Sequence, residues 1–148
     1  TTLLKQLIPA LCARGIRPGL IKHTHHDMDV DKPGKDSYEL RKAGAAQTIV
    51  ASQQRWALMT ETPDEEELDL QFLASRMDTS KLDLILVEGF DREAHLPTLE
   101  VWRTQDVPFR SREEWRCAVI TDLPCETKLP VFSPSDIDAI ADFIGTLL

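Results

Sequence analysis

The chain has 148 residues, of which 42% are hydrophobic, and this composition is typical of one folded domain with a core rather than of a disordered chain. Its formal net charge of −8 argues against broad, non-specific binding to nucleic acid or to an anionic membrane surface. No apolar run approaches the roughly 18 residues of a membrane-spanning helix and no secretory signal is recognisable, so we expect a cytoplasmic protein.

Residues 1–14 place apolar side chains at helical spacing, and Gly15 is positioned to end this helix. Pro9 lies inside the pattern, so we expect the helix to be kinked or broken there. A short strand interrupted by a Pro-Gly pair follows over residues 16–22. Helix, tight turn and strand in this order are typical of an α/β protein.

The sequence of residues 36–60 predicts a short helix followed by a hairpin. Asp36 or Ser37 can cap a helix that Gly44 ends, and the strand-like runs 47–51 and 55–60 are separated by a turn short enough for a β-hairpin.

Residues 62–67 have the composition of a helix start: a threonine at the N-cap, a proline at the first helical position and acids in the first turn. This helix start accounts for the acidic residues, so we assign them no ligand-binding role. Apolar residues supply the expected buried face: Leu68, Leu70, Phe72, Leu73 and Met77.

Residues 82–90 form an almost unbroken apolar run that ends in Glu88 and Gly89, as expected for a parallel strand buried on both faces. In open α/β sheets ligands bind beyond the carboxyl ends of the strands, so Glu88 would reach the ligand crevice, and Gly89 allows a sharp turn. The alternative is that Glu88 only ends a core strand and faces solvent.

Further strands are expected at 99–102, 115–121 and 129–132, with a charged loop over 103–114 and a final helix that starts at 133–136. We therefore predict an α/β fold with a mostly parallel, partly mixed sheet.

Thr1 and Thr2 open the first helix, where a Walker A loop would place its hydroxyl residues after Gly-Lys. They can equally be simple helix caps. Glu88 supports the first interpretation, because a P-loop site needs an acid at a strand end to orient magnesium or its water.

A histidine- and aspartate-rich segment, residues 22–27, follows the second element. Its spacing does not match a structural zinc site. Asp27 or Asp36 could reach a magnesium-water shell, whereas Asp29 and Asp31 can be explained as a solvated loop.

Asp122 follows the predicted strand 115–121, where a carboxylate can accept paired hydrogen bonds from guanine. An ordinary turn residue is the alternative.

Six motifs occur together and resemble the MobB family of molybdopterin-guanine dinucleotide biosynthesis adapter proteins, which are P-loop GTP-binding proteins. In chain order the motifs are Thr1-Thr2-Leu3-Leu4, Ile21-Lys22-His23-Thr24-His25-His26-Asp27, Pro33-Gly34-Lys35-Asp36-Ser37, Arg41-Lys42-Ala43-Gly44-Ala45, Val87-Glu88-Gly89-Phe90 and Pro97-Thr98-Leu99-Glu100-Val101.

The resemblance implies a P-loop NTPase-like three-layer domain over residues 1–148 that lacks the N-terminal strand and the Gly-rich loop. It implies a homodimer that binds GTP and Mg, hydrolyses GTP weakly, and assists a molybdenum cofactor guanylyltransferase in attaching GMP to molybdopterin. Metal ligands would be Thr1, Asp27 and Glu88, with Glu88 also catalytic. The residues implied to bind the nucleotide are Thr1, Thr2, His23, His26, Asp27, Lys35, Asp36, Ser37, Gly89 and Asp122.

The chain departs from the family pattern in three ways. The Walker A Gly-Lys is not in the sequence, and Asp91 and Thr98 stand where the family commonly has lysine. Two alternatives remain: a small-molecule kinase on a related P-loop scaffold, and a non-catalytic metal-binding module centred on the histidines.

Overall fold

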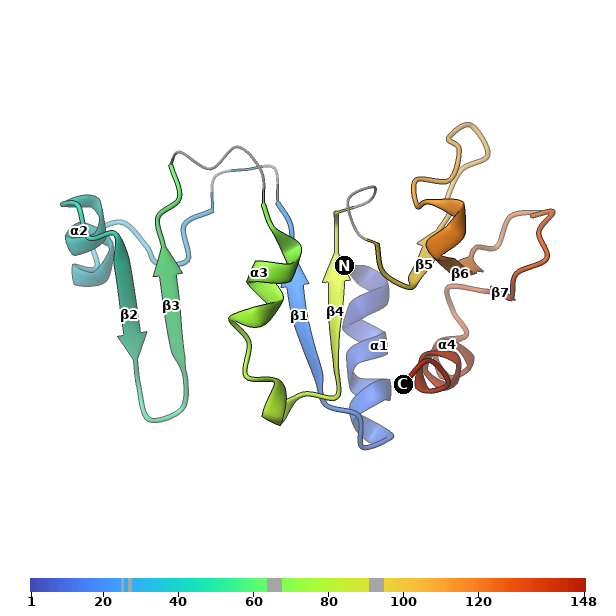
Figure 1. Cartoon of the computed structure of the whole chain (residues 1–148), viewed down its shortest axis with the longest axis horizontal. Coiled ribbons are helices and arrows are strands. Elements are labelled where there is room, and N and C mark those ends of the chain that lie inside the picture. The colour runs from blue at the N-terminus through green and yellow to red at the C-terminus, as the bar shows by residue number, and fades with distance from the viewer. Residues whose placement is uncertain (25, 27, 64–67, 91–94) are drawn as a thin grey trace. The chain divides into compact units, whose positions relative to one another are not determined.

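The computed structural model describes residues 1–24, 26, 28–63, 68–90 and 95–148 (Figure 1). The chain divides into two compact units. The first unit consists of Thr1–His23 and Asp69–Leu148, and the second of Thr24–Leu68. None of the helices formed by the described residues has the length and apolar character needed to cross a membrane.

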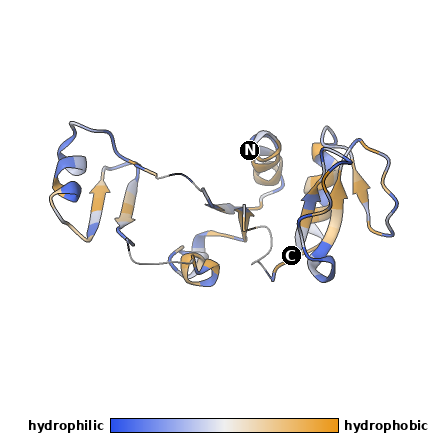
Figure 2. Cartoon of the chain, turned by 90° about the horizontal axis from the view of Figure 1, so that it is seen from above, coloured by the Kyte–Doolittle hydropathy of each residue, from blue (hydrophilic) through white to orange (hydrophobic). Residues whose placement is uncertain are grey.

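The first unit has α/β architecture with parallel strand pairing. β1 pairs with β4, and β5, β6 and β7 form a separate three-stranded sheet in that order. Figures 1 and 2 show α1 and α3 on opposite faces of the β1–β4 pair, which gives three layers. The elements are α1 (Thr2–Ala13), β1 (Pro18–Lys22), α3 (Leu70–Ser75), η1 (Thr79–Lys81), β4 (Leu84–Glu88), β5 (Thr98–Val101), η2 (Glu113–Trp115), β6 (Arg116–Ile120), β7 (Val131–Phe132) and α4 (Ile137–Gly145).

Helix α1 is continuous through Pro9, so of the two expected outcomes, a kink or a break, the break is wrong. Leu7 and Leu11, one on each side of the proline, are 3% and 0% exposed, and their burial holds both halves of the helix on one core. The predicted end is confirmed. Gly15 has φ +76°, its N–H donates to the Cys12 carbonyl, and the Ile16 N–H donates to the Leu11 carbonyl, which is a Schellman motif.

The core of the first unit joins α1, α4 and β6. Its buried members are Leu7, Leu11, Ile120, Ile140, Ala141 and Ile144, and side chains from β4 and β5 pack against them. Arg14 ties the two helices together at the surface, because its guanidinium donates to Asp142 at 2.7 Å and to Asp138 at 3.1 Å.

Strand β1 includes the Pro-Gly pair that was expected to interrupt it. A Cβ at Gly19 would lie 2.8 Å from both Leu82 Cδ1 and Met77 Cε. A side chain at this position would require the flexible ends of Leu82 and Met77 to shift.

The strand expected over 82–90 is present as β4, but its residues are all half-buried rather than fully buried. Among the described residues β1 is its only hydrogen-bonded neighbour.

Helix α3 is much shorter than predicted. It begins after Asp69, whose side chain accepts a hydrogen bond from the Phe72 N–H, and none of its residues is fully buried. Phe72 is 55% exposed, so the expected buried face is only partly realised. Residues 64–67 of the predicted helix start lie outside the described residues.

The second unit contains α2 (Asp36–Lys42) and an antiparallel hairpin of β2 (Gln47–Ala51) and β3 (Trp56–Thr60), which confirms the predicted hairpin. The predicted side-chain cap of α2 is wrong. Helix α2 has Lys35 as its N-cap, without a side-chain hydrogen bond, because Asp36 already lies inside the helix.

Arg41 organises the second unit. Its side chain is 6% exposed, and its guanidinium donates to Asp29 and Asp31 at 2.7 Å and to Glu61 at 3.0 Å. For Asp31 the alternative of a solvated loop does not hold, because pairing with Arg41 leaves its side chain only 9% exposed. Asp29 remains 43% exposed.

Candidate functional site

The candidate site lies where β1 and β4 end. The two strands are parallel and in register, so Lys22 stands opposite Glu88 at the carboxyl edge of the pair. The ladder continues one residue further, because the His23 N–H donates to the Glu88 carbonyl at 2.9 Å. Thr1, the N-cap of α1, meets this edge from the helix.

Three side chains converge there. The Thr1 hydroxyl donates to Glu88 Oε1 at 2.8 Å, and Lys22 Nζ lies 3.2 Å from Glu88 Oε2 and 3.3 Å from Thr1 Oγ1. The Thr1 amino group also lies 2.6 Å from Glu88 Oε1. The Glu88 side chain is 26% exposed, whereas those of Thr1 and Lys22 are 60% and 52% exposed, so the cluster opens to solvent.

These contacts lower the pKa of Glu88 to about 2. The Thr1 amino group is the largest cause, followed by the Thr1 hydroxyl, and Lys22 adds a smaller lowering against the opposing effect of desolvation. The hydroxyl and Lys22 act through side chains, so their contributions do not depend on a charged amine at Thr1. Glu88 is therefore ionised at neutral pH.

The backbone after Glu88 is sharply turned. Gly89 has φ +93° and Phe90 has φ 60°, a left-handed conformation that costs free energy for a bulky residue. A Cβ at Gly89 would lie 2.8 Å from His23 Cβ, and the His23 ring lies 4.8 Å from the Phe90 ring, centroid to centroid. The turn therefore needs glycine at this position, and it holds His23 against the end of β4.

The cluster combines a hydroxyl, an ionised carboxylate and a lysine at the N-terminus of a 12-residue helix. Hydroxyl and carboxylate oxygens suit Mg²⁺, which is usually held by one or two protein oxygens together with substrate phosphates. The lysine and the helix N-terminus favour anions. The residues therefore fit a phosphate group with its magnesium ion.

The structure brings together Thr1, His23, Glu88 and Gly89 of the predicted site residues, and Thr2 is the first residue of α1. Sequence reasoning did not include Lys22 among the site residues. The signal that could have found it is the pairing of the two strand ends.

Other predicted site residues lie in the second unit: His26, Lys35, Asp36 and Ser37. The His26 N–H donates to the Thr24 hydroxyl, and Lys35 and Asp36 are exposed at the start of α2. Asp27, predicted as a metal ligand, lies outside the described residues.

Asp122 lies one residue beyond the buried Thr121, just past the end of β6. Its Oδ1 accepts a hydrogen bond of 2.6 Å from the hydroxyl of Ser133, which follows β7. The bond fixes the orientation of an otherwise exposed carboxylate.

A histidine-centred metal site finds no support in the part of the chain that the structure describes, where no three histidine, cysteine or acidic side chains are grouped to hold a metal ion. His25, one of the three histidines of that hypothesis, lies outside the described residues.

The parallel α/β architecture, with a helix N-terminus, a hydroxyl and a strand-end carboxylate at one edge, defines a P-loop NTPase-like protein. The family model described as "Molybdopterin guanine dinucleotide synthesis protein B" matches residues 1–122. The chain belongs to this family, MobB.

Curated relatives support this family assignment. A protein of Escherichia coli (strain K12) is 68% identical over 148 residues, covering 97% of this chain and 83% of the relative. A protein of Haemophilus influenzae is 46% identical, covering 100% of this chain and 82% of the relative. Both are named "Molybdopterin-guanine dinucleotide biosynthesis adapter protein".

A solved structure confirms the fold. The crystal structure titled "molybdopterin-guanine biosynthesis protein B (mobB)" superimposes with a TM-score of 0.76 at 26% identity, covering 99% of this chain and 91% of that chain.

Proposed function

We propose that this chain is a GTP-binding adapter in molybdenum cofactor biosynthesis that assists the attachment of GMP to molybdopterin. Family membership supports the pathway, and the observation that carries the nucleotide site is the contact of Glu88 with Thr1 and Lys22. In this proposal Thr1 and Glu88 hold the magnesium ion and Lys22 faces the phosphates. Asp27 is a further metal ligand in the proposal.

The remaining nucleotide contacts are assigned by position. Thr2 lies next to Thr1 at the helix N-terminus, where backbone N–H groups favour phosphate. His23 and Gly89 shape the turn beside Glu88. We include His26, Lys35, Asp36 and Ser37 because the family resemblance assigns them to the phosphate end.

Asp122 is the proposed base contact. Guanine presents a ring N–H and an exocyclic amine side by side, and a carboxylate accepts from both, whereas adenine has no equivalent donor pair. The hydrogen bond from Ser133 to Oδ1 supports this role, because it orients the carboxylate before a base arrives.

Hydrolysis, where it occurs, is weak. The chain's own contribution is electrostatic: Lys22 and the N-terminus of α1 stabilise negative charge, and Glu88 orients magnesium or its water. The partner is a molybdenum cofactor guanylyltransferase, with molybdopterin as the recipient of GMP.

The adapter acts as a homodimer in this proposal. Support comes from β5, which has β6 as its one hydrogen-bonded neighbour among the described strands, so its other edge can pair with another strand.

The test is a titration of the full-length protein with fluorescently labelled GTP and ATP in the presence of Mg²⁺. We expect saturable GTP binding that weakens about 10- to 100-fold in Glu88→Gln, as for loss of a charge-assisted contact. Glu114→Gln is the matched control, since the Glu114 side chain is 62% exposed and pairs only at 3.9 Å with Arg112. Absence of saturable binding of either nucleotide would sink the proposal.

A further inference from the structure

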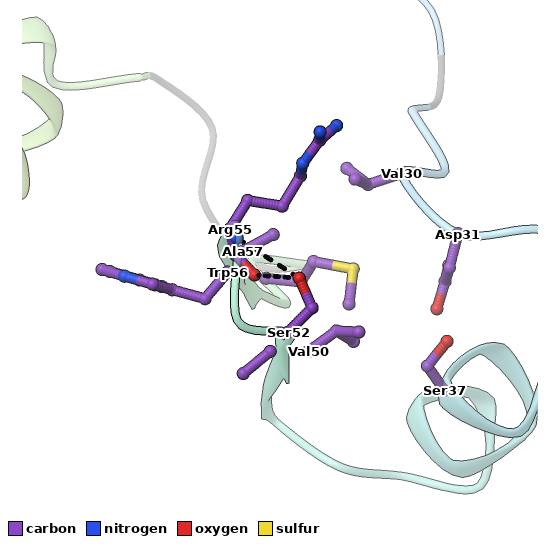
Figure 3. Close-up of a pocket in the computed structure, with 10 residues that line it drawn as sticks. Val30, Asp31, Ser37, Val50, Ser52, Arg55, Trp56 and Ala57 are labelled. Carbon is purple, nitrogen blue, oxygen red and sulfur yellow. Dashed lines mark hydrogen bonds between the residues drawn. The ribbon is translucent and has the colours of Figure 1, made fainter.

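The second unit contains a pocket of about 280 Å³ between the loop at residue 31, the start of α2 and the hairpin (Figure 3). The acidic side chain in its lining, Asp31, is 9% exposed and pairs with Arg41 at 2.7 Å, so its charge is used in a contact inside the unit. Most of the other lining side chains are apolar, among them Val50 and Met59. A feature that neither this pocket nor the fold explains lies in the first unit, in the turn after Glu88.

Phe90 has a strained backbone. Its φ of 60° lies in the left-handed region, and no other residue except glycine among those that the structure describes has a positive φ. A left-handed backbone brings Cβ close to the following carbonyl oxygen, which costs free energy for a residue with a bulky side chain. Such a conformation persists only where contacts of the side chain compensate for it.

The Phe90 side chain makes contacts of this kind. It is 4% exposed, although it does not belong to the core cluster that α1, α4 and β6 share. Its ring lies 4.8 Å from the His23 ring, centroid to centroid, and the planes are inclined by 34°. Tilted rings at this separation attract each other. Because His23 directly follows β1, the ring pair joins the two chain segments that leave the paired strands β1 and β4.

Glu88 is held from both sides. On one side, strand pairing places it opposite Lys22, and its carbonyl accepts from the His23 N–H at 2.9 Å. On the other side, one residue separates it from the buried ring of Phe90. Its carboxylate accepts from the Thr1 hydroxyl at 2.8 Å, and a site of this kind requires its groups to be placed within about 0.5 Å.

We propose that Phe90 is a positioning residue for the magnesium site: its buried ring holds the turn so that the Glu88 carboxylate is in place before the nucleotide binds. The inference rests on the proposed function, in which Thr1 and Glu88 hold the ion. It explains why the strained position is not occupied by a second glycine. Glycine would make the turn without strain, but it has no side chain that could anchor the turn.

The test measures the Mg²⁺ concentration at which the full-length protein reaches half-maximal binding of labelled GTP. Phe90→Gly removes the ring and the strain together, because glycine adopts a positive φ freely. We expect the half-saturating Mg²⁺ concentration to rise about tenfold in this variant, as for the loss of a group that supports a metal ligand.

Two further variants separate positioning from a general loss of stability. Phe90→Leu keeps a large apolar side chain, so its half-saturating Mg²⁺ concentration should stay within about twofold of the wild type. Ile144→Ala is the matched control. Its side chain is similarly buried, at 7% exposed, but it belongs to α4, which supplies no residue to the site, so its Mg²⁺ requirement should be unchanged.

A second measurement uses no nucleotide. Urea unfolding of the wild type, Glu88→Gln, Phe90→Gly and the double variant gives the coupling between the two residues. If the ring places Glu88 against Thr1 and Lys22, Glu88→Gln should change the unfolding equilibrium constant at least about threefold less in the Phe90→Gly background than in the wild type. Phe90→Asn, which also tolerates a positive φ, replaces Phe90→Gly in both measurements if the glycine variant does not fold.

Three results would overturn the inference: equal Mg²⁺ requirements in the wild type and Phe90→Gly, additive losses of stability in the double variant, or an equally raised Mg²⁺ requirement in Ile144→Ala. The last result would assign the effect to a general loss of stability. Absence of GTP binding in the wild type contradicts the proposed function instead, and the urea measurement then still decides whether Phe90 positions Glu88.

Discussion

Replacing Glu88 with glutamine keeps the shape of the side chain and removes the charge that Thr1 and Lys22 contact. Loss of hydrogen bonds to a charged group costs about 1.5–3 kcal/mol when the partners are buried. The partners of Glu88 are more than half exposed, at 60% and 52%, so solvent screening reduces the expected loss to about 1–2 kcal/mol.

The pH dependence has a definite sign. Because the pKa of Glu88 is lowered by folding, the stabilisation is fully present above about pH 4.5 and is lost as the pH falls to about 2. The difference in free energy of unfolding between wild type and Glu88→Gln should therefore shrink by about half at pH 3. Urea denaturation at pH 7, 5 and 3 measures it, with Glu114→Gln as the control that should differ little from wild type at any pH. Equal stability of wild type and Glu88→Gln at pH 7, or a difference that does not change with pH, would refute the reasoning.

Two further substitutions test the core and the turn. Leu11→Ala should destabilise the protein by about 2–5 kcal/mol, because the Leu11 side chain is 0% exposed. Leu147 is 44% exposed, so Leu147→Ala should cost well under about 1 kcal/mol. Thermal unfolding compares the two variants, and equal losses of stability would contradict the core assignment. Gly89→Ala should be more destabilising than Gly34→Ala, for which we expect a cost of about 1 kcal/mol. Both glycines have positive φ, but only at Gly89 would a Cβ lie 2.8 Å from His23 Cβ. Similar unfolding midpoints for the two variants would show that this contact relaxes freely.

Signals that lie within a few residues predicted the structure well. The Schellman end at Gly15 depends on hydrogen bonds between neighbours in the chain, and the β2–β3 hairpin depends on a short turn between two apolar runs. The predicted length of α3 was wrong. Capping signals mark where a helix can begin, but packing against the core decides how many residues are helical.

Features that depend on distant residues were harder to predict. The direct contact of Lys22 with Glu88 was not predicted, because it follows from the register of two strands that are far apart in the sequence. The burial of Asp31 was not predicted because several aspartates in one loop are usually exposed to solvent. Here the ion pair with Arg41 buries Asp31. In both cases the missing information was a cation supplied by another element.

These two carboxylates differ in what can reach them. The pKa of each is lowered by hydrogen bonds from neighbouring groups, Thr1 and Lys22 for Glu88 and Arg41 for Asp31. Glu88 is 26% exposed and touches a hydroxyl, so water and a hydrated cation can reach it. Asp31 is 9% exposed and pairs with Arg41 at 2.7 Å, so its charge is used in a contact inside the second unit. We therefore expect Glu88→Gln to weaken Mg²⁺-dependent GTP binding and Asp31→Asn to lower the stability of the second unit through its lost contact with Arg41. Unchanged GTP binding in Glu88→Gln, or unchanged stability in Asp31→Asn, would contradict this division.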